Sequence, residues 1–272
     1  YIMKVSYFPG CTLRTTAKKL DDYARACAEK LGIELVEIKD WQCCGGVFVT
    51  AKDEAASKLP GVRALRAAKE RGEILVTVCS ACHNVIKQTN HAVQTDPEFA
   101  DKVNLYMSQD KDASEHEPYH GETQVMHFFE LLRDVVGFDK IKENVVKPLT
   151  GRKIAPYYGC LLLRPGRVMA FDDIENPSVM EDFIRALGAE PVVYPMRNEC
   201  CGGYVALDDP ASAAKKSGAV IGSAVSHGAD CAVTACPLCK YNLEKNTDEI
   251  PVVYFTELLA EALGIKEDND VR

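Results

Sequence analysis

The chain has 272 residues, of which 47% are hydrophobic and 26% charged, a composition that allows a substantial buried core. Its formal net charge of −8 argues against nucleic acid or an anionic membrane surface as a partner. No apolar run approaches the roughly 20 residues that span a bilayer, and no signal peptide is visible, so we expect a cytoplasmic location.

The first half of the chain alternates short predicted strands with helices. Strands are expected at 4–8, 33–38 and 74–78, and helices at 16–31 and 52–71 and from 82 to 89. Gly32 and Gly72 stand where the first two helices would end, in the position after a helix that favours glycine. The stretch 90–124 that follows is polar and weakly periodic, and we interpret it as an insertion.

The second half repeats this order after a connector at 138–151. Strands are expected at 153–158, 191–194 and 231–234, and helices at 179–187 and 210–227. Similar helix starts then follow in both halves, at 128–132 and at 254–259. We therefore expect an α/β fold of two pseudo-symmetric halves, residues 1–137 and 152–272, each a small, mostly parallel sheet with flanking helices.

Ten of the twelve cysteines form two matching sets. The first set is Cys11, Cys43, Cys44, Cys79 and Cys82, and the second set is Cys160, Cys200, Cys201, Cys236 and Cys239. The offset from the adjacent pair to the Cys-x-x-Cys is 35 residues in both sets (79 − 44 and 236 − 201), and both pairs continue as Cys-Cys-Gly-Gly. Because the carboxyl ends of parallel strands share one edge of a sheet, we expect the cysteines of each set to converge there.

The number of cysteines in each set limits the kind of metal site that the set can form. Twelve cysteines without a secretory signal indicate metal binding or redox chemistry rather than the disulfides of a small secreted scaffold. A zinc site or an ordinary cubane cluster uses four ligands, so five cysteines per set leave a spare thiol or a cluster that uses a fifth. Repetition of the fifth cysteine in both sets favours the second interpretation.

Neighbouring residues favour an iron–sulfur site over zinc. Each Gly-Gly offers backbone N–H donors, and Cys82 and Cys239 open predicted helices, whose N-termini stabilise thiolates. The string Cys-Ser-Ala-Cys-His at 79–83 also matches a c-type haem attachment, but the second set has Lys240 where His83 stands. We interpret His83 as a polar residue at a helix start.

Two cysteines fall outside the repeat. Cys27 lies on the apolar face of a predicted helix, and Cys231 begins a buried strand. Free cysteine is among the most readily buried residues, so we expect both to be core thiols.

The arrangement Cys…Cys-Cys-Gly…Cys-x-x-Cys, present twice across about residues 3–265, resembles the CCG family of cysteine-rich domains. The chain carries this duplicated module and lacks a ferredoxin-type Cys-x-x-Cys-x-x-Cys-x-x-x-Cys-Pro run. In this respect it is similar to the B subunit of heterodisulfide reductase, rather than to family members that fuse ferredoxin motifs to the module.

The resemblance implies a redox function. Each set would ligate one non-cubane [4Fe-4S] cluster through its five cysteines, and the two clusters would reduce the disulfide of coenzyme M and coenzyme B to two thiols, as in methanogenesis. A small two-cluster, ferredoxin-like protein of the kind that forms the C subunit would deliver electrons. A flavin and iron–sulfur protein of the kind that forms the A subunit would supply them. The alternative is an electron-transfer module within a complex that acts on a quinone or on another sulfur substrate.

Two arginines are candidates for binding an anionic substrate. Arg14 lies three residues after Cys11, and Arg164 lies four residues after Cys160. A guanidinium group suits sulfonate, phosphate or carboxylate. The alternative is that both arginines neutralise the charge of a cluster or pair with nearby acids.

Overall fold

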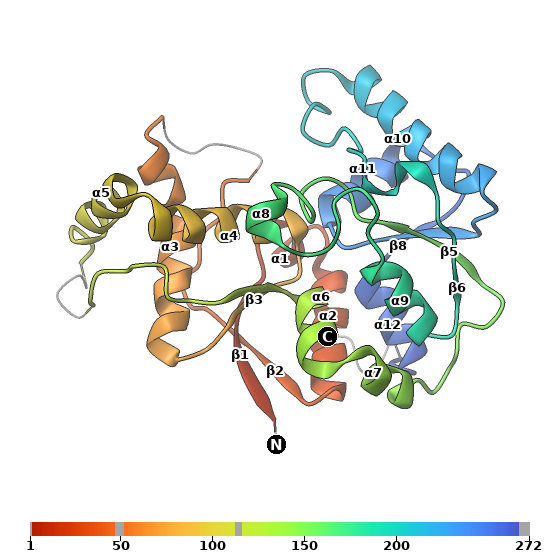
Figure 1. The fold of residues 1–272 in the computed structure, drawn as a ribbon, viewed down its shortest axis with the longest axis horizontal. Helices are drawn as coiled ribbons and strands as arrows, with labels where there is room; N and C mark the ends of the chain where they lie inside the picture. Colours follow the sequence, from red (N-terminus) through yellow and green to blue (C-terminus); the bar gives the residue numbers. More distant parts are fainter. Residues whose placement is uncertain (1, 47–51, 112–115, 267–272) are drawn as a thin grey trace.

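The computed structural model describes residues 2–46, 52–111 and 116–266. Within these residues the strands form two four-stranded parallel sheets, with the orders β2-β1-β3-β4 and β6-β5-β7-β8. The strands are β1 (Met3–Phe8), β2 (Ile33–Glu37), β3 (Leu75–Thr77), β4 (Val125–His127), β5 (Lys153–Tyr157), β6 (Glu190–Pro191), β7 (Cys231–Thr234) and β8 (Val252–Tyr254). In both sheets the second strand of the half lies at one edge and is followed by the first, third and fourth, so the two halves are pseudo-symmetric (Figure 1).

Helices flank both sheets. In the first half they are α1 (Cys11–Arg14), α2 (Lys18–Lys30), α3 (Glu54–Arg71), α4 (Ser80–Thr95), α5 (Pro97–Met107), α6 (Phe128–Leu131), the π-helix η2 (Leu132–Val136) and α7 (Phe138–Asn144). In the second half they are α8 (Gly166–Met169), α9 (Val179–Ala186), the 3₁₀-helix η3 (Pro195–Asn198), α10 (Pro210–Ser226), α11 (Pro237–Asn246) and α12 (Phe255–Ala262). The predicted α/β fold with two parallel-sheet halves is therefore confirmed.

The polar stretch 90–124 is more regular than its weak periodicity indicates. Helix α4 continues to Thr95, and α5 begins at Pro97, with the carboxylate of Asp96 accepting a hydrogen bond from the amide of Phe99 at 3.1 Å. An aspartate N-cap followed by proline is a strong start signal even where the apolar pattern is weak. Residues 112–115 of this stretch lie outside the described residues. Residue 1 of the first predicted half and residues 267–272 of the second also lie outside them.

The strand order creates a switch point in each sheet. Tyr7 of β1 is in register with Glu37 of β2 on one side and with Val76 of β3 on the other. The connections that leave β1 and β3 therefore diverge and open a crevice at the carboxyl ends of these strands. In the second sheet β5 and β7 are paired in the same way, with Tyr157 beside Thr234. The first cysteine and the Cys-x-x-Cys of each set follow these four strands, and the adjacent pairs follow β2 and β6.

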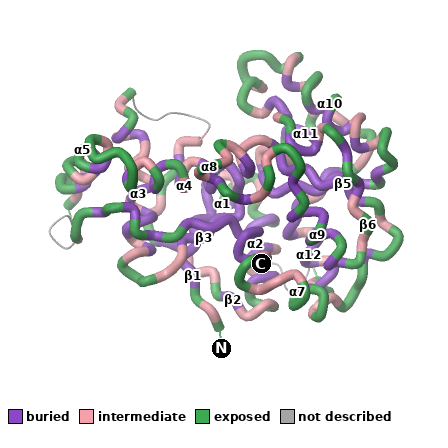
Figure 2. The backbone as a smooth tube through the Cα atoms, in the orientation of Figure 1, coloured by how far each residue is buried: buried purple, intermediate pink, exposed green. Residues whose placement is uncertain are grey.

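The two halves interlock through helices that cross between them. Helix α12 of the second half lies on α2 of the first, where the Thr256 hydroxyl donates to the Leu20 carbonyl at 3.1 Å and the Cys27 thiol donates to the Thr256 carbonyl at 3.6 Å (Figure 1). A helix of the first half also packs on a helix of the second half, since the ring centroids of Phe129 in α6 and Phe183 in α9 lie 4.8 Å apart. Figure 2 shows buried residues running through the centre of the molecule, with exposed ones on outer helices such as α5.

A buried histidine lies in this shared core. His127 ends β4 with no exposed surface, and its Nδ1 atom accepts a hydrogen bond from the amide of Phe129 at 3.1 Å. Burial, reinforced by the nearby imidazole of His83, lowers the pKa of His127 to about 3. The unfolded chain therefore takes up a proton near pH 6.5 that the folded chain does not bind, so this histidine stabilises the fold above that pH and less below it.

We expect the free energy of unfolding to fall as the pH drops from roughly 6.5 towards 4, with His127 contributing up to about 1.4 kcal/mol per pH unit. The His127→Asn variant keeps an acceptor at the N-cap and should flatten this decline. The matched change of the exposed His91 to Asn should leave it unaltered. Urea unfolding at several pH values measures both slopes, and an unchanged slope in His127→Asn would contradict the assignment.

Candidate metal centre

The five thiols of the first set gather at the carboxyl ends of the strands. The Sγ atoms of Cys11 and Cys43 lie 3.7 Å apart, and those of Cys44 and Cys82 lie 3.4 Å apart. Cys43 and Cys44 are adjacent in the chain, and Cys79 is close enough to Cys82 to raise the pKa of its thiol. Cys11 and Cys43 are exposed at one end, whereas the other three thiols are buried.

The second set repeats this arrangement. The Sγ atoms of Cys201 and Cys239 lie 3.7 Å apart, and Cys236 is close enough to Cys239 to raise the pKa of its thiol. At the other end, Cys200 raises the pKa of Cys160 in the same way, and Cys200 is adjacent to Cys201 in the chain. Both predicted sets therefore converge in space as separate groups of five.

The two groups of thiols meet at the boundary between the halves, where Cys79 and Cys236 are close enough for each thiol to shift the pKa of the other. The residues just before them are tied together as well, since the Tyr254 hydroxyl lies 2.6 Å from the Val78 carbonyl and 3.1 Å from the Ala235 carbonyl. Sequence reasoning missed Tyr254. Its signal was the helix start shared by 128–132 and 254–259.

Backbone N–H groups of the Gly-Gly pairs face cysteine sulfur atoms in both sets. The Gly202 amide donates to the Sγ atom of Cys200 at 3.4 Å. The amides of Gly45, Gly46 and Gly203 act to lower the pKa of Cys43, Cys44 and Cys201, respectively. The Cys82 thiol, whose Sγ atom lies 3.4 Å away, together with the Gly46 amide, lowers the pKa of Cys44 to about 7. The Cys160 thiol, together with the Gly202 amide, lowers the pKa of Cys200 to about 6. Such donors favour thiolate, the form that binds metal.

The glycine before the first cysteine of each set is a second feature that sequence reasoning missed. Gly10 has φ +79°, and a Cβ atom there would lie 2.8 Å from the Sγ atom of Cys82. Gly159 has φ +65°, and a Cβ atom there would lie 3.4 Å from the Sγ atom of Cys239. In both halves the backbone thus passes directly against the last thiol of the set. The repeated Gly-Cys dipeptide was the available signal.

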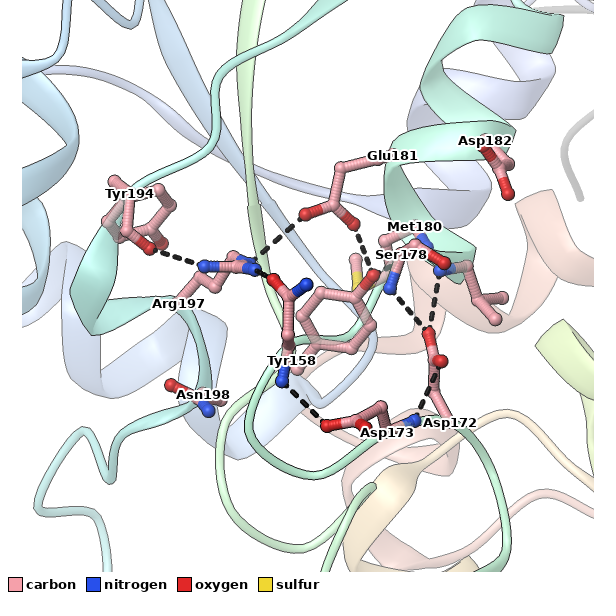
Figure 3. Close-up of polar contacts among 12 residues, drawn as sticks. Tyr158, Asp172, Asp173, Ser178, Met180, Glu181, Asp182, Tyr194, Arg197 and Asn198 are labelled. Carbon is pink, nitrogen blue, oxygen red and sulfur yellow. Dashed lines mark hydrogen bonds and ion pairs between the residues drawn. The ribbon is translucent and has the colours of Figure 1, made fainter.

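A buried ion pair holds the loops of the second set (Figure 3). Glu181 in α9 and Arg197 in η3 approach to 3.1 Å, and their side chains are 2% and 8% exposed. The Tyr158 hydroxyl donates to the Glu181 carboxylate, and the Tyr158 amide donates to the Arg197 carbonyl at 2.8 Å. Tyr158 precedes Cys160 by two residues and Arg197 precedes Cys200 by three, so the network fixes the spacing of both loops.

Replacing Glu181 with Gln is expected to lower the free energy of unfolding by about 3 kcal/mol, because Arg197 would be left buried without a counter-ion. Glu175→Gln is the matched control, since Glu175 is 77% exposed and lies 3.5 Å from Arg164. That exposed pair should change stability by less than about 0.5 kcal/mol. Urea unfolding compares the two variants, and equal losses would show that the buried pair has no special role.

The two arginines predicted to bind substrate already have protein partners. Arg164 donates to the Asn198 carbonyl at 2.9 Å and lies 3.5 Å from the Glu175 carboxylate. The Nε atom of Arg14 lies 3.6 Å from the carboxylate of Glu37. This placement agrees with the alternative that both arginines pair with nearby acids, although their side chains remain 37% and 44% exposed.

The two cysteines outside the sets and His83 are buried. Cys27 and Cys231 lie in the core, where burial raises the pKa of both thiols. His83 lies in the first turn of α4, as expected, but it is fully buried, with its Nε2 atom 3.0 Å from the Glu130 carboxylate. Burial lowers the pKa of His83, although Glu130 opposes that shift.

A cavity of about 500 Å³ lies at the second set, and all five cysteines of that set line it. Its walls also include Tyr204, Leu207 and Tyr241. The Tyr204 hydroxyl donates to the Gly46 carbonyl at 2.7 Å, so one wall of the cavity reaches the Gly-Gly loop of the first set. Burial, and to a smaller extent the thiols of both sets, raise the pKa of Tyr204.

The donor set suits a sulfur-rich cluster. Thiolates are the soft ligands that iron–sulfur clusters use, and backbone N–H donors around sulfur are a common second layer of such sites. Two of the thiols, Cys79 and Cys236, also stand at the N-termini of α4 and α11, where the helix favours negative charge. In residues 2–46, 52–111 and 116–266, no group of three or more His, Cys, Asp or Glu side chains forms a site for a single metal ion.

Comparisons with known proteins agree with the cysteine pattern. The cysteine-rich domain called CCG matches residues 5–87 and 154–244. Over 270 residues, 96% of this chain and 92% of the relative, the sequence is 32% identical to the 8-methylmenaquinol:fumarate reductase membrane anchor subunit of Wolinella succinogenes. Over 280 residues, 98% of this chain and 91% of the relative, it is 28% identical to the B subunit of the ferredoxin/F420H2-dependent CoB-CoM heterodisulfide reductase of Methanosarcina acetivorans.

Two further matches extend the comparison. A protein of Archaeoglobus profundus, named as similar to the heterodisulfide reductase B subunit, is 28% identical over 98% of this chain and 93% of its own length. The crystal structure of a hypothetical protein from Helicobacter pylori superposes with a TM-score of 0.74 at 14% identity, covering 98% of this chain and 50% of that one, a likeness of fold alone. The two matched segments each contain one complete cysteine set. The chain belongs to the CCG family of cysteine-rich domains, and it is similar over nearly its full length to the B subunit of heterodisulfide reductase.

Proposed function

We propose that the chain is the cluster-bearing subunit of a heterodisulfide reductase-type complex, in which it reduces a disulfide to two thiols. The observation that carries this proposal is the proximity of the two thiol sets, because the Tyr254 hydroxyl contacts both the Val78 and the Ala235 carbonyl, next to Cys79 and Cys236. Two separate sites that meet at one boundary suit a reaction that handles two sulfur atoms at once.

The residues that would hold the cofactors are the two sets themselves. Cys11, Cys43, Cys44, Cys79 and Cys82 would hold one [4Fe-4S] cluster of the non-cubane type, and Cys160, Cys200, Cys201, Cys236 and Cys239 the other. Backbone amides of the Gly-Gly pairs would stabilise the thiolate ligands, and the hydrogen bonds of Tyr254 would hold the two sites side by side.

The proposed reaction breaks one S–S bond and leaves two thiols, so each sulfur takes up one electron and one proton. When bound, the two clusters would supply those two electrons. The protein residues near the boundary would position the disulfide between the sets, and the protons would come from water at the open cavity. The substrate would be the coenzyme M–coenzyme B disulfide or a related disulfide.

The proposal includes partners and an anionic contact. Electrons would arrive from a small ferredoxin-like protein equivalent to the C subunit of heterodisulfide reductase, supplied in turn by a flavin and iron–sulfur protein equivalent to its A subunit. Arg14 and Arg164 remain proposed contacts for anionic groups of the substrate. A raised KM for the disulfide in Arg14→Ala or Arg164→Ala, with iron content unchanged, would support this role, and an unchanged KM would exclude it.

Anaerobic purification followed by iron and sulfide analysis tests the cofactors. Two four-iron clusters give about eight irons per chain, and addition of a thiol after oxidation should produce an EPR signal unlike that of a cubane. Zinc as the bound metal, or about four irons in a single cubane, would contradict the proposal.

A second candidate function follows from the Wolinella succinogenes relative, whose name assigns it to a menaquinol:fumarate reductase. By analogy, the chain would relay electrons within a complex that acts on a quinone. None of the helices in the described residues is long and apolar enough to cross a membrane. Reoxidation of the reduced, cluster-loaded protein by a soluble menaquinone analogue but not by disulfides would favour this candidate over the first.

A further inference from the structure

We propose that a cavity between helix α3 and the loop after β2 binds a small carboxylate with an apolar body, held by the guanidinium group of Arg66. The cavity has a volume of about 200 Å³, and both Arg66 and Trp41 line it. Its described lining residues include no cysteine. The site is therefore separate from both thiol sets and does not depend on the proposed function.

Arg66 is a buried cation with hydrogen-bond donors to spare. It lies on α3 and is 8% exposed. The Oε1 atom of Glu70 lies 3.8 Å from the Nε atom of Arg66, too far for a hydrogen bond, and the same oxygen lies 2.5 Å from the Nδ1 atom of His116. Within residues 2–46, 52–111 and 116–266, no hydrogen bond satisfies the guanidinium group of Arg66. Because a buried cation with unmet donors is unfavourable, this group favours a bound anion.

The other charges around the cavity favour a single negative charge on the ligand. Arg63 is already held by the Asp110 carboxylate through hydrogen bonds of 2.6 and 2.8 Å. Lys39 and Asp40 are exposed in the lining and carry opposite charges. The carboxylates of Asp40 and Glu70 repel an anion, and they repel a dianion such as phosphate more strongly than a monoanion. A carboxylate is therefore the oxyanion that fits.

Apolar side chains make up much of the remaining wall. They are Ile38, Trp41, Pro60, Ala64 and Ala67. Apolar and charged walls together suit a ligand that has a carboxylate at one end and a short hydrocarbon body at the other. The volume is below the roughly 300–1,000 Å³ of pockets for drug-sized ligands, so the hydrocarbon body is limited to a few carbon atoms.

Titration of the anaerobically purified protein with butyrate tests the proposal. Trp41 is the only tryptophan in the sequence, so its fluorescence reports binding in this cavity, while calorimetry gives the affinity. Butyrate should bind at least about tenfold more tightly than neutral butanamide, which cannot form charge-assisted hydrogen bonds with Arg66. It should also bind about tenfold more tightly than acetate, because two more methylene groups are buried.

Three results would overturn the proposal. They are equal binding of butyrate and butanamide, butyrate binding that leaves the Trp41 fluorescence unchanged, and tighter binding of phosphate than of butyrate. Equal binding of acetate and butyrate would overturn the apolar body of the ligand.

Arginine variants locate the site. Arg66→Gln should weaken butyrate binding at least about tenfold and leave butanamide binding unchanged. Arg167→Gln should change neither, since Arg167 lies on α8 and does not line the cavity. Arg66→Lys keeps the positive charge and should keep the preference for butyrate over butanamide. Unaltered butyrate affinity in Arg66→Gln would overturn the role of Arg66. If Arg66→Gln does not fold, the comparison of butyrate with butanamide on the unsubstituted protein still decides.

Discussion

Replacing Cys82 with Ser should remove the proposed first cluster and leave the proposed second one, which lowers the iron content from about eight to about four per chain. Cys82 is 5% exposed and contacts both Cys44, at 3.4 Å, and Cys79, so it joins the two parts of the first set. A serine hydroxyl is a harder ligand than thiolate and binds such clusters poorly. Because a disulfide needs two electrons, its reduction should fall to background.

The control for this variant is Cys27→Ser. Cys27 is equally buried, and its thiol donates to the Thr256 carbonyl rather than to another thiol. Iron content, acid-labile sulfide and the EPR signal of the second cluster are measured on both variants. Full iron in Cys82→Ser would remove this residue from the ligand set, and a comparable loss in Cys27→Ser would show that the effect is general unfolding.

Substitution of Gly10 by Ala should disrupt the first site although no cysteine is altered. The new Cβ atom would stand 2.8 Å from the Sγ atom of Cys82, in a backbone conformation of φ +79° that alanine adopts poorly. The thiol would have to move or the strand end would have to shift. We expect loss of most of the iron of the first cluster, about four irons per chain, with the second cluster retained.

Gly72→Ala separates this effect from backbone strain. Gly72 has a similar φ of +66°, but a Cβ atom there would meet nothing within 4 Å. It should cost about 1 kcal/mol of stability and no iron. Gly159→Ala, with its Cβ atom at 3.4 Å from the Sγ atom of Cys239, should disturb the second site more mildly. Iron analysis beside urea unfolding distinguishes the three, and equal iron in Gly10→Ala and Gly72→Ala would disprove the steric argument.

Much of the fold could be predicted because its signals are local. Periodicity, together with glycine at helix ends, placed most strands and helices within a few residues of their observed bounds, and the repeat predicted two similar halves. The main difference between the predicted and the observed secondary structure lies in the stretch 90–124, because α5 depends on a capping signal rather than on a strong apolar stripe. Strand β6 is also shorter than expected, with only Glu190 and Pro191 paired.

The amino-acid sequence by itself determined the two cysteine sets and the family to which they belong, because residue type and spacing are properties of the chain alone. Only the tertiary structure decided that Cys79 meets Cys236, that Tyr254 ties the two strand ends together and that Tyr204 reaches Gly46. Apart from Tyr254 and Ala235, these partners lie more than 150 residues apart and in different halves, and no local pattern specifies which of them will touch. Their contacts follow from the packing of α12 on α2 and of α6 on α9. Burial of apolar side chains from both halves drives this packing.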